Sequence, residues 1–257
     1  MIIMNITYLI IFFLFGIIMG NIYTMIGLRL PNDDAKLFSK SHCDVCYHKL
    51  TFLESLPIVS YIFLRGRCPY CHKKIDIKNI IMEIVTGVLF VLSYYTFGLS
   101  IDLLIALGVV SLLVIVSVGD LVYMIIPDEV LIFFSGYFII INYFKLGLMG
   151  ALEHIFVGLF LFFIMYTIML LGEKMFKRES LGGGDVKMMF VFGLVLDPIV
   201  GSLTIFLGSM LALPISLFMY YKYHNNAIPF GPFLLLAFAL LYFMRIDANF
   251  IIYLLGL

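Results

Sequence analysis

Long apolar stretches constrain this sequence more than any other feature. A helix that crosses the hydrocarbon layer of a bilayer needs about 20 consecutive, mainly apolar residues. Eight stretches approach that composition, at residues 6–28, 80–98, 102–119, 129–147, 150–172, 187–197, 199–221 and 229–246. Charged residues make up only 12% of the chain, roughly half the fraction that is usual in soluble domains. The sequence therefore predicts an all-α polytopic membrane protein with about eight transmembrane helices, and it excludes soluble globular and disordered chains.

The distribution of charge predicts how these helices are oriented. The only long polar segment, residues 29–79, contains nine of the sixteen lysine and arginine residues. If this segment is cytoplasmic, the alternation of spans places 14 basic residues on that side and leaves only Lys145 and Arg245 on the other. Such an excess of positive charge is typical of cytoplasmic loops. We therefore expect a cytoplasmic segment 29–79 and an amino terminus on the opposite side of the membrane.

The first 28 residues predict a retained membrane anchor. They contain no charged residue, whereas a cleavable signal peptide begins with a positively charged region. The chain is thus expected to consist of a first transmembrane helix (1–28), a cytoplasmic cysteine-rich loop domain (29–79) and a membrane-embedded domain (80–257).

The polar segment carries the pattern of a metal site. It contains all four cysteines of the chain, in two C-x-x-C pairs separated by 21 residues: Cys43, Cys46, Cys68 and Cys71. Two such pairs resemble a zinc ribbon, in which four thiolates surround the metal as a tetrahedron. A reducing cytoplasm favours this use over disulfides. Because a four-cysteine site leaves no open coordination position, we favour a zinc ion that folds the loop rather than one that catalyses a reaction. The nearby alternative ligands are His42, His48 and His72.

Two aspartates lie where a membrane protein rarely tolerates them. Asp120 ends a long apolar stretch and is followed by more apolar residues, and Asp185 follows three consecutive glycines. The charge distribution places both on the cytoplasmic side. A carboxylate within the membrane costs about 2.5–3.5 kcal/mol on insertion scales and indicates function by default. Taken singly, each aspartate is equally well explained as an interfacial cap; together, beside glycine- and proline-containing breaks, they favour a functional pair.

A pair of close carboxyls would have a definite chemistry. At a separation of ~4 Å and an effective dielectric constant of ~20, two ionised carboxylates repel each other by about 4 kcal/mol. That repulsion is sufficient for the pair to share one proton near neutral pH. The ionised member can then activate water and the protonated member can donate to a peptide carbonyl, as in aspartic proteases. Spacing alone does not show that the two residues meet, because 65 positions separate them.

Several motifs along the chain resemble those of the type IV prepilin peptidases. These membrane aspartic proteases also process the pseudopilins of competence and type II secretion. The first catalytic motif is matched by Asp120 and the following Ile126-Pro127-Asp128, and the second, Gly-x-Gly-Asp, by Gly182 to Asp185. The other matching segments are Gly20-Asn21, Arg29-Leu30-Pro31, Ser41 to Cys43, Leu56 to Tyr61, Arg65 to Cys68, Glu83 to Gly87 and Ile228 to Phe233.

The resemblance implies a function and a set of site residues. Asp120 and Asp185 would be the catalytic pair of an aspartic peptidase domain spanning residues 80–257, with Gly182 and Gly184 shaping the second motif. Asp128 is either a supporting residue or simply the start of a helix. Lys187 is expected either to orient Asp185 or to face phospholipid. The position of Glu83 matches an acidic family position, although a carboxylate near a helix amino terminus is also favourable on electrostatic grounds.

The resemblance also implies partners and cofactors. The substrates would be prepilins or pseudopilins, cut after the short basic leader at the cytoplasmic face of the bacterial inner membrane. The new amino terminus would then be methylated with S-adenosylmethionine, although no glycine-rich nucleotide loop locates that cofactor. Partners are prepilins and membrane lipid, and no nucleic acid is expected. The alternatives are a peptidase without methylation, an ion or metal transporter, which the absence of visible repeats disfavours, and a structural pilus assembly protein.

Overall fold

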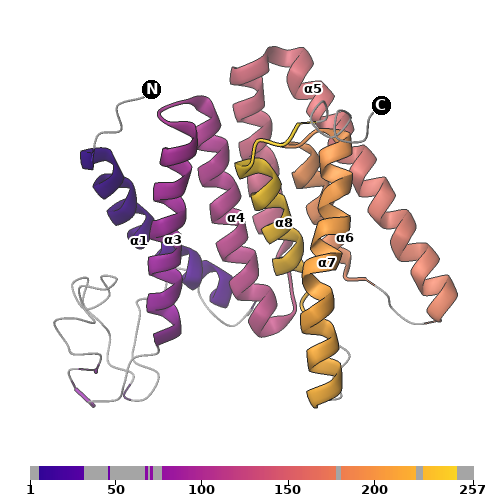
Figure 1. The fold of residues 1–257 in the computed structure, drawn as a ribbon, viewed down its shortest axis with the longest axis horizontal. Helices are drawn as coiled ribbons and strands as arrows, with labels where there is room; N and C mark the ends of the chain where they lie inside the picture. Colours follow the sequence, from indigo (N-terminus) through magenta and orange to yellow (C-terminus); the bar gives the residue numbers. More distant parts are fainter. Residues whose placement is uncertain are drawn as a thin grey trace. The chain divides into compact units, whose positions relative to one another are not determined.

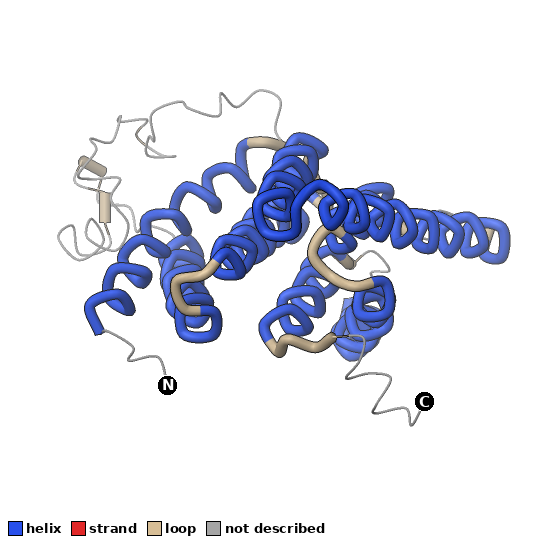
Figure 2. Tube along the Cα trace, turned by 90° about the horizontal axis from the view of Figure 1, so that it is seen from above, coloured by secondary structure: helices blue, strands red, loops and turns tan. Residues whose placement is uncertain are grey.

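The secondary-structure elements of the described part of the chain are helices. The computed structural model describes residues 6–31, 46, 67–68, 70–71, 77–177, 181–223 and 228–247. Within these residues there are seven helices and no strand (Figure 1, Figure 2). The helices are α1 (Ile6–Arg29), α3 (Ile77–Phe97), α4 (Ile101–Tyr123), α5 (Asp128–Phe176), α6 (Gly183–Gly193), α7 (Pro198–Tyr223) and α8 (Gly231–Phe243). The prediction of an all-α polytopic membrane protein is confirmed.

Every predicted apolar stretch contributes to a helix. Among the described helices, α1, α3, α4, α5 and α7 are long and apolar enough to cross a bilayer. The stretches 129–147 and 150–172 both lie in the 49-residue helix α5. The stretches 187–197 and 229–246 correspond to α6 and α8, which have 11 and 13 residues and are too short to cross a bilayer by length.

Helix α5 is divided by a break at Gly147. This residue has φ 76° and ψ −175°, a backbone conformation that side chains strongly disfavour, and the helix is kinked here. Figure 1 shows the first part of α5 beside α4 and the second part turning back from it. The break separates the two predicted spans at the position where the sequence analysis divided them.

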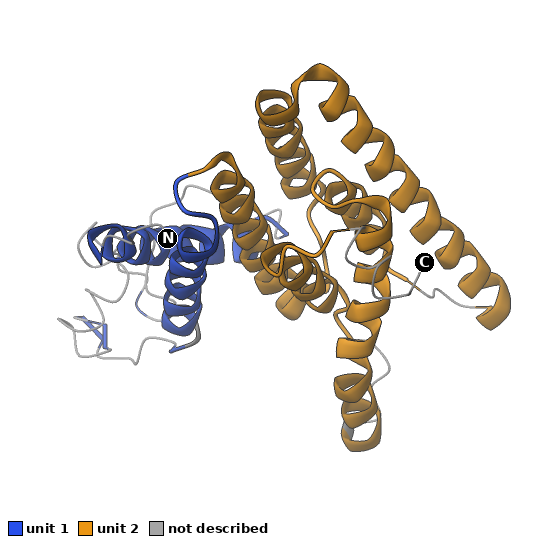
Figure 3. Ribbon diagram, turned by 45° about the horizontal axis from the view of Figure 1, so that its top comes forward, with its two compact units in different colours: residues 1–99 blue, residues 100–257 orange. Residues whose placement is uncertain are grey.

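The helices pack as two units, residues 1–99 and 100–257 (Figure 3). In the first unit α1 packs along α3. Asn21 of α1 donates a hydrogen bond to the buried Glu83 of α3, with 2.8 Å between Nδ2 and Oε1. By packing, α3 therefore belongs with α1, although the sequence analysis grouped it with the peptidase domain. The predicted division into a first transmembrane helix (1–28), a loop domain (29–79) and a peptidase domain (80–257) stays a prediction.

The second unit is built around α4, whose buried face lies against α5 and α8. Between α6 and α8 the rings of Phe192 and Phe238 stack with 4.3 Å between their centroids. These apolar contacts fix α4, α6 and α8 relative to one another, and with them the polar side chains at the helix ends.

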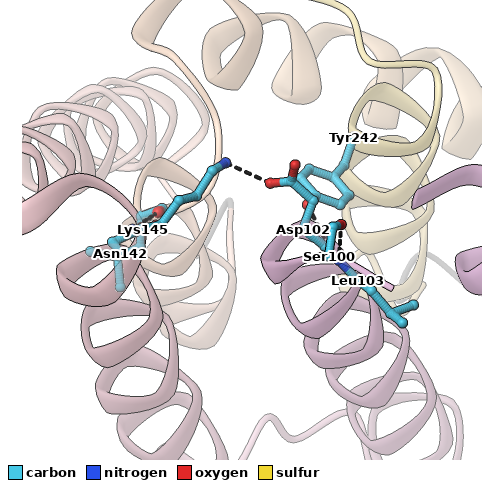
Figure 4. Close-up of polar contacts among 7 residues, drawn as sticks. Ser100, Asp102, Leu103, Asn142, Lys145 and Tyr242 are labelled. Atoms are coloured by element: carbon cyan, nitrogen blue, oxygen red, sulfur yellow. Dashed lines mark hydrogen bonds and ion pairs between the residues drawn. The ribbon is translucent and has the colours of Figure 1, made fainter. Parts of the chain in front are cut away.

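One end of the second unit is held by polar contacts around Asp102 (Figure 4). Lys145 of α5 forms an ion pair with Asp102 of α4, with 2.6 Å between Nζ and Oδ1. The Tyr242 hydroxyl of α8 donates to the Asp102 carbonyl at 3.0 Å. Ser100, rather than Asp102, caps α4, because its side chain accepts the Leu103 amide. The start of α4, the middle of α5 and the end of α8 therefore lie together.

Candidate functional site

The opposite end of α4 carries Asp120. This residue lies in the last turn of the helix and is 5% exposed. The helix ends at Tyr123, and its C-cap, Met124, has φ 55° and donates its amide to the Asp120 carbonyl at 2.9 Å. The residues from Leu121 to Ile125 are exposed, so Asp120 is the point at which the chain passes from the packed core of the unit to its surface.

Asp185 lies in the first turn of α6 and is 7% exposed. Gly182 caps this helix, and its carbonyl accepts the Asp185 amide at 3.1 Å. The three glycines before Asp185 keep the turn free of side chains. A Cβ atom on Gly184 would stand 2.8 Å from Cβ of Ile126, which is closer than two carbon atoms can pack. The second motif can therefore lie directly against the segment between α4 and α5.

The two aspartates meet at the start of α8. The Gly231 amide donates a hydrogen bond to Oδ2 of Asp120 at 3.2 Å. A Cβ atom on Gly231 would lie 2.8 Å from that oxygen and 3.4 Å from Oδ1 of Asp185. The separation of the two oxygens therefore cannot exceed the sum of these distances. Three helices, α4, α6 and α8, bring together residues that lie up to 111 positions apart.

The electrostatics of the pair follow from burial and proximity. Oδ1 of Asp185 is the buried side-chain oxygen that lacks a hydrogen-bond partner within the described residues. Helix α6 is too short to span the bilayer, and Asp185 lies near its end. Burial, and then the negative charge of Asp120, raise the pKa of Asp185 to about 7, against the weaker effect of a hydrogen bond from the Gly182 backbone. Burial and the nearby Asp120 therefore both favour a proton on Asp185.

Lys187 and Asp128 pair with each other beside this site. Lys187 Nζ lies 2.7 Å from both carboxylate oxygens of Asp128, and both side chains are about half exposed. Asp128 also begins α5, as expected for a helix start. Through this contact the lysine joins the beginning of α6 to the beginning of α5. The sequence analysis considered that Lys187 orients Asp185 or faces phospholipid, and it did not consider a pair with Asp128.

Glu83 belongs to the first unit and takes part in the packing of α1 on α3. Its side chain is 3% exposed and accepts the hydrogen bond from Asn21. A Cβ atom on Gly20 would lie 2.9 Å from Cα of Glu83, so the two helices approach closely at this level. Two segments that carry the family resemblance, Gly20-Asn21 and Glu83, thus contact each other.

Three of the four cysteines form a cluster. The sulfur atoms of Cys46, Cys68 and Cys71 lie within 4.8 Å of one another, and those of Cys46 and Cys68 are 3.8 Å apart. A tetrahedral zinc ion with bonds of about 2.3 Å to sulfur holds its ligands about 3.8 Å apart, so these residues fit three of its corners. A disulfide requires about 2.05 Å between sulfurs, and none joins these three. Cys43 and the three alternative histidines lie outside the described residues.

Gly231 and Ile126 are site residues whose contacts the sequence reasoning did not identify. The only signal was that both lie in segments that resemble family motifs, Ile126-Pro127-Asp128 and Ile228 to Phe233. Nothing in the residue types indicates that Gly231 contacts a carboxylate 111 positions away, or that Ile126 lies against Gly184.

The chain is similar to known families along most of its length. Residues 14–97 match the bacterial peptidase A24 N-terminal domain, and residues 107–217 match the type IV leader peptidase family. A prepilin leader peptidase/N-methyltransferase of Bacillus subtilis is 34% identical over 192 residues, which cover 72% of this chain and 73% of that protein. Proteins with the same name from Myxococcus xanthus and Vibrio cholerae are 32% and 25% identical, covering 70% and 93% of this chain and 54% and 98% of their own lengths. No solved structure matches significantly.

Proposed function

Because the chain belongs to the type IV leader peptidase family, we propose that it is a membrane aspartic endopeptidase that removes the leader from prepilins or pseudopilins, with Asp120 and Asp185 as its catalytic pair. The observation that carries this assignment is the approach of both carboxyl groups to Gly231 from different helices. Burying two carboxyl groups close together is costly, which supports a functional role for the pair over a structural one.

The proposed reaction needs one ionised and one protonated carboxyl. The ionised group takes a proton from a water molecule as the water oxygen attacks the peptide carbonyl carbon, while the protonated group gives its proton to the carbonyl oxygen. The tetrahedral intermediate then collapses. The carbon–nitrogen bond breaks, the leaving amine takes up the proton abstracted from water, and the carboxyl that donated its proton recovers one from the intermediate.

The proposed site of cleavage is the cytoplasmic face of the inner membrane. Asp120 and Asp185 lie at the end of the second unit away from Asp102 and Lys145, as the alternating topology requires. On the orientation expected from the basic residues, this end faces the cytoplasm, where a basic leader remains in water while the helical part of the substrate stays in lipid. Hydrolysis at the rim of the bundle also gives water access to the pair.

A second activity, methylation of the new amino terminus, is proposed with S-adenosylmethionine as the methyl donor. The support is that the matched relatives are named as peptidases and N-methyltransferases. We assign no residue to this cofactor. Zinc is proposed for Cys43, Cys46, Cys68 and Cys71, on the support of the three clustered sulfurs. In this arrangement the metal would fold the loop and supply no catalytic position.

The test uses the two conservative variants Asp120→Asn and Asp185→Asn. Each should abolish cleavage of a prepilin-like substrate while the protein still accumulates in the membrane, because asparagine keeps the shape but cannot exchange a proton. The exposed Asp197→Asn serves as the matched control and should cleave normally. Cleavage by either dyad variant would remove the catalytic assignment.

Mass spectrometry of the processed substrate, with S-adenosylmethionine present, separates the full proposal from the peptidase-only alternative. The bifunctional enzyme leaves a methyl group on the new amino terminus. A product that is cut but carries no methyl group would restrict the chain to proteolysis. A transporter would yield neither product, and the comparisons give that alternative no support.

A further inference from the structure

Gly231 lies beside both carboxyl groups. Its amide donates to Oδ2 of Asp120, and its missing side chain leaves the space in which that oxygen and Oδ1 of Asp185 approach each other. Any larger residue would place a carbon atom 2.8 Å from the Asp120 oxygen. The start of α8 is therefore part of the site and does more than fill space beside it.

The amide of Gly231 is available because of the sequence around it. It is the first residue of the 13-residue helix α8, where amides have no partner within the helix. Pro232 has no N–H to donate, and the amides of Phe233 and Leu234 donate to the Phe230 carbonyl. The Gly231 amide is consequently the group of this first turn that donates to Asp120, and such a donor favours the ionised form of a carboxyl.

Asp185, unlike Asp120, has a buried carboxyl oxygen that accepts no hydrogen bond from the described residues. Its Oδ1, which faces Gly231, is buried and accepts no hydrogen bond. The amides of Asp185 and Val186, at the start of α6, are both used by the Gly182 carbonyl. If Oδ1 carries a proton, it becomes a hydrogen-bond donor that can use Asp120 as its acceptor. Protonation then removes the free-energy cost of a buried oxygen without a hydrogen bond.

We propose that Gly231 is a positioning residue that makes the pair asymmetric: its amide holds Asp120 as the carboxylate, and the shared proton rests on Oδ1 of Asp185. Asp120 is then the base that takes a proton from the attacking water, and Asp185 is the acid that donates to the peptide carbonyl. This assignment of roles rests on the proposed peptidase function, whereas the asymmetry itself does not.

The other charged groups near the pair do not reverse this assignment. Lys187 is the nearest basic group on α6, and it is engaged by both oxygens of Asp128. The C-terminal end of α4 opposes a negative charge on Asp120, and the N-terminal end of α6 favours one on Asp185. A hydrogen bond from the Gly182 backbone also favours the ionised form of Asp185. Against these effects stand the stronger effect of burial on Asp185, its unpartnered Oδ1 and the direct hydrogen bond from Gly231 to Asp120, and the asymmetry is inferred from these three.

The decisive experiment measures ionisation directly and does not depend on activity. The full-length Asp120→Asn and Asp185→Asn variants, purified in detergent, are titrated by infrared spectroscopy of their carboxyl groups. Subtraction of the double variant isolates the single remaining member of the pair. Asp120, present in Asp185→Asn, should ionise at a lower pH than Asp185, present in Asp120→Asn. Equal midpoints, or the reverse order, would overturn the proposal.

The role of Gly231 is tested by adding Gly231→Ala to each background. The new methyl group displaces Oδ2 of Asp120 from the amide, so the titration of Asp120 should move to higher pH while that of Asp185 stays close to its position. In the otherwise native chain the same substitution should lower kcat/KM about ten- to a hundredfold, the range expected for a hydrogen bond to a charged group.

Gly136→Ala is the matched control, because a Cβ atom there meets nothing within 4 Å. It should leave both titrations and the cleavage rate unchanged. A Gly231→Ala protein with an unmoved Asp120 titration would show that the glycine has no positioning role. If Gly231→Ala fails to accumulate, the titrations of the two single-aspartate proteins still decide the asymmetry. Loss of the proposed function is recognised separately, by cleavage that persists in the asparagine variants.

Discussion

The substitution Gly184→Ala tests whether the glycines of the second motif exist to bring Asp185 against the α4–α5 segment. A Cβ atom at this position would lie 2.8 Å from Cβ, 3.1 Å from Cδ1 and 3.3 Å from Cγ1 of Ile126. Carbon atoms pack at about 3.5–4.0 Å, so the start of α6 must move away by several tenths of an ångström or more. The nearest atom is a Cβ fixed to the backbone, which a rotamer change cannot remove.

The magnitude follows from two general relations. Overpacking of this kind costs about 1–3 kcal/mol of stability. Because Asp185 is the next residue, the displacement also separates it from Asp120, and a misplacement of about 1 Å lowers catalysis as much as a hundredfold. We expect Gly184→Ala to lower kcat/KM by about that factor and to reduce the thermal unfolding midpoint.

Gly183→Ala is the internal control. It is the same chemical change one residue earlier, at the variable position of the Gly-x-Gly-Asp motif, and its Cβ atom would meet nothing within 4 Å. The change should be neutral or stabilise the protein by about 0.4–1 kcal/mol, since alanine restricts the unfolded chain. The assay compares cleavage of a prepilin-like substrate and thermal unfolding of both variants in the same detergent. Equal activity of the two variants would refute the close-approach argument.

Three further predictions concern other parts of the site. Burial and Asp120 raise the pKa of Asp185 from 3.8 to about 7, so the native state holds that proton more tightly than the unfolded chain and stability should fall as pH rises from about 4 to 7. Asp185→Asn should remove this fall in thermal unfolding measured across that range. An unchanged pH dependence in the variant would contradict this prediction. Lys187→Met should lower the free energy of unfolding by only about 0.2–1 kcal/mol, because the ion pair with Asp128 is half exposed. The exchanged pair Lys187→Asp/Asp128→Lys should recover part of that stability in unfolding experiments, and no recovery would exclude a direct interaction. Purified protein should contain about one zinc ion per chain by elemental analysis, and Cys68→Ser should lose it, whereas metal retained without Cys68 would argue against a thiolate site.

The helices were predictable because their signal is local. About 20 apolar residues suffice to predict a span, and each predicted stretch overlaps a helix. The start of α6 was less accessible to this reasoning. The predicted stretch began at Lys187, whereas the helix begins at Gly183, because two glycines and an aspartate lower the hydropathy of its first turn. The same glycines and aspartate that form the site therefore made the start of α6 difficult to predict from hydropathy.

The contacts of the site were less predictable because they join distant segments. Asp120 and Asp185 were identified from their unusual positions and from the motifs, but 65 intervening residues carry no information about distance. The partner of Lys187 is Asp128, 59 positions away, and neither role considered for the lysine included it. Only the packing of α4, α6 and α8 determines which of these side chains meet.

The two ends of the second unit show why the pair at Asp120 is not a stabilising feature. At the Asp102 end, the carboxylate is matched by Lys145 at 2.6 Å, and the helix start is capped by Ser100. At the other end two carboxyl groups face each other, and one buried oxygen of Asp185 has no partner among the described residues. An unsatisfied buried polar atom costs about 1–3 kcal/mol, and a well-packed apolar side chain in its place would cost nothing comparable. In the proposed function, this cost falls on the group that holds and releases the proton, because Oδ1 of Asp185 gains a donor role only when it is protonated.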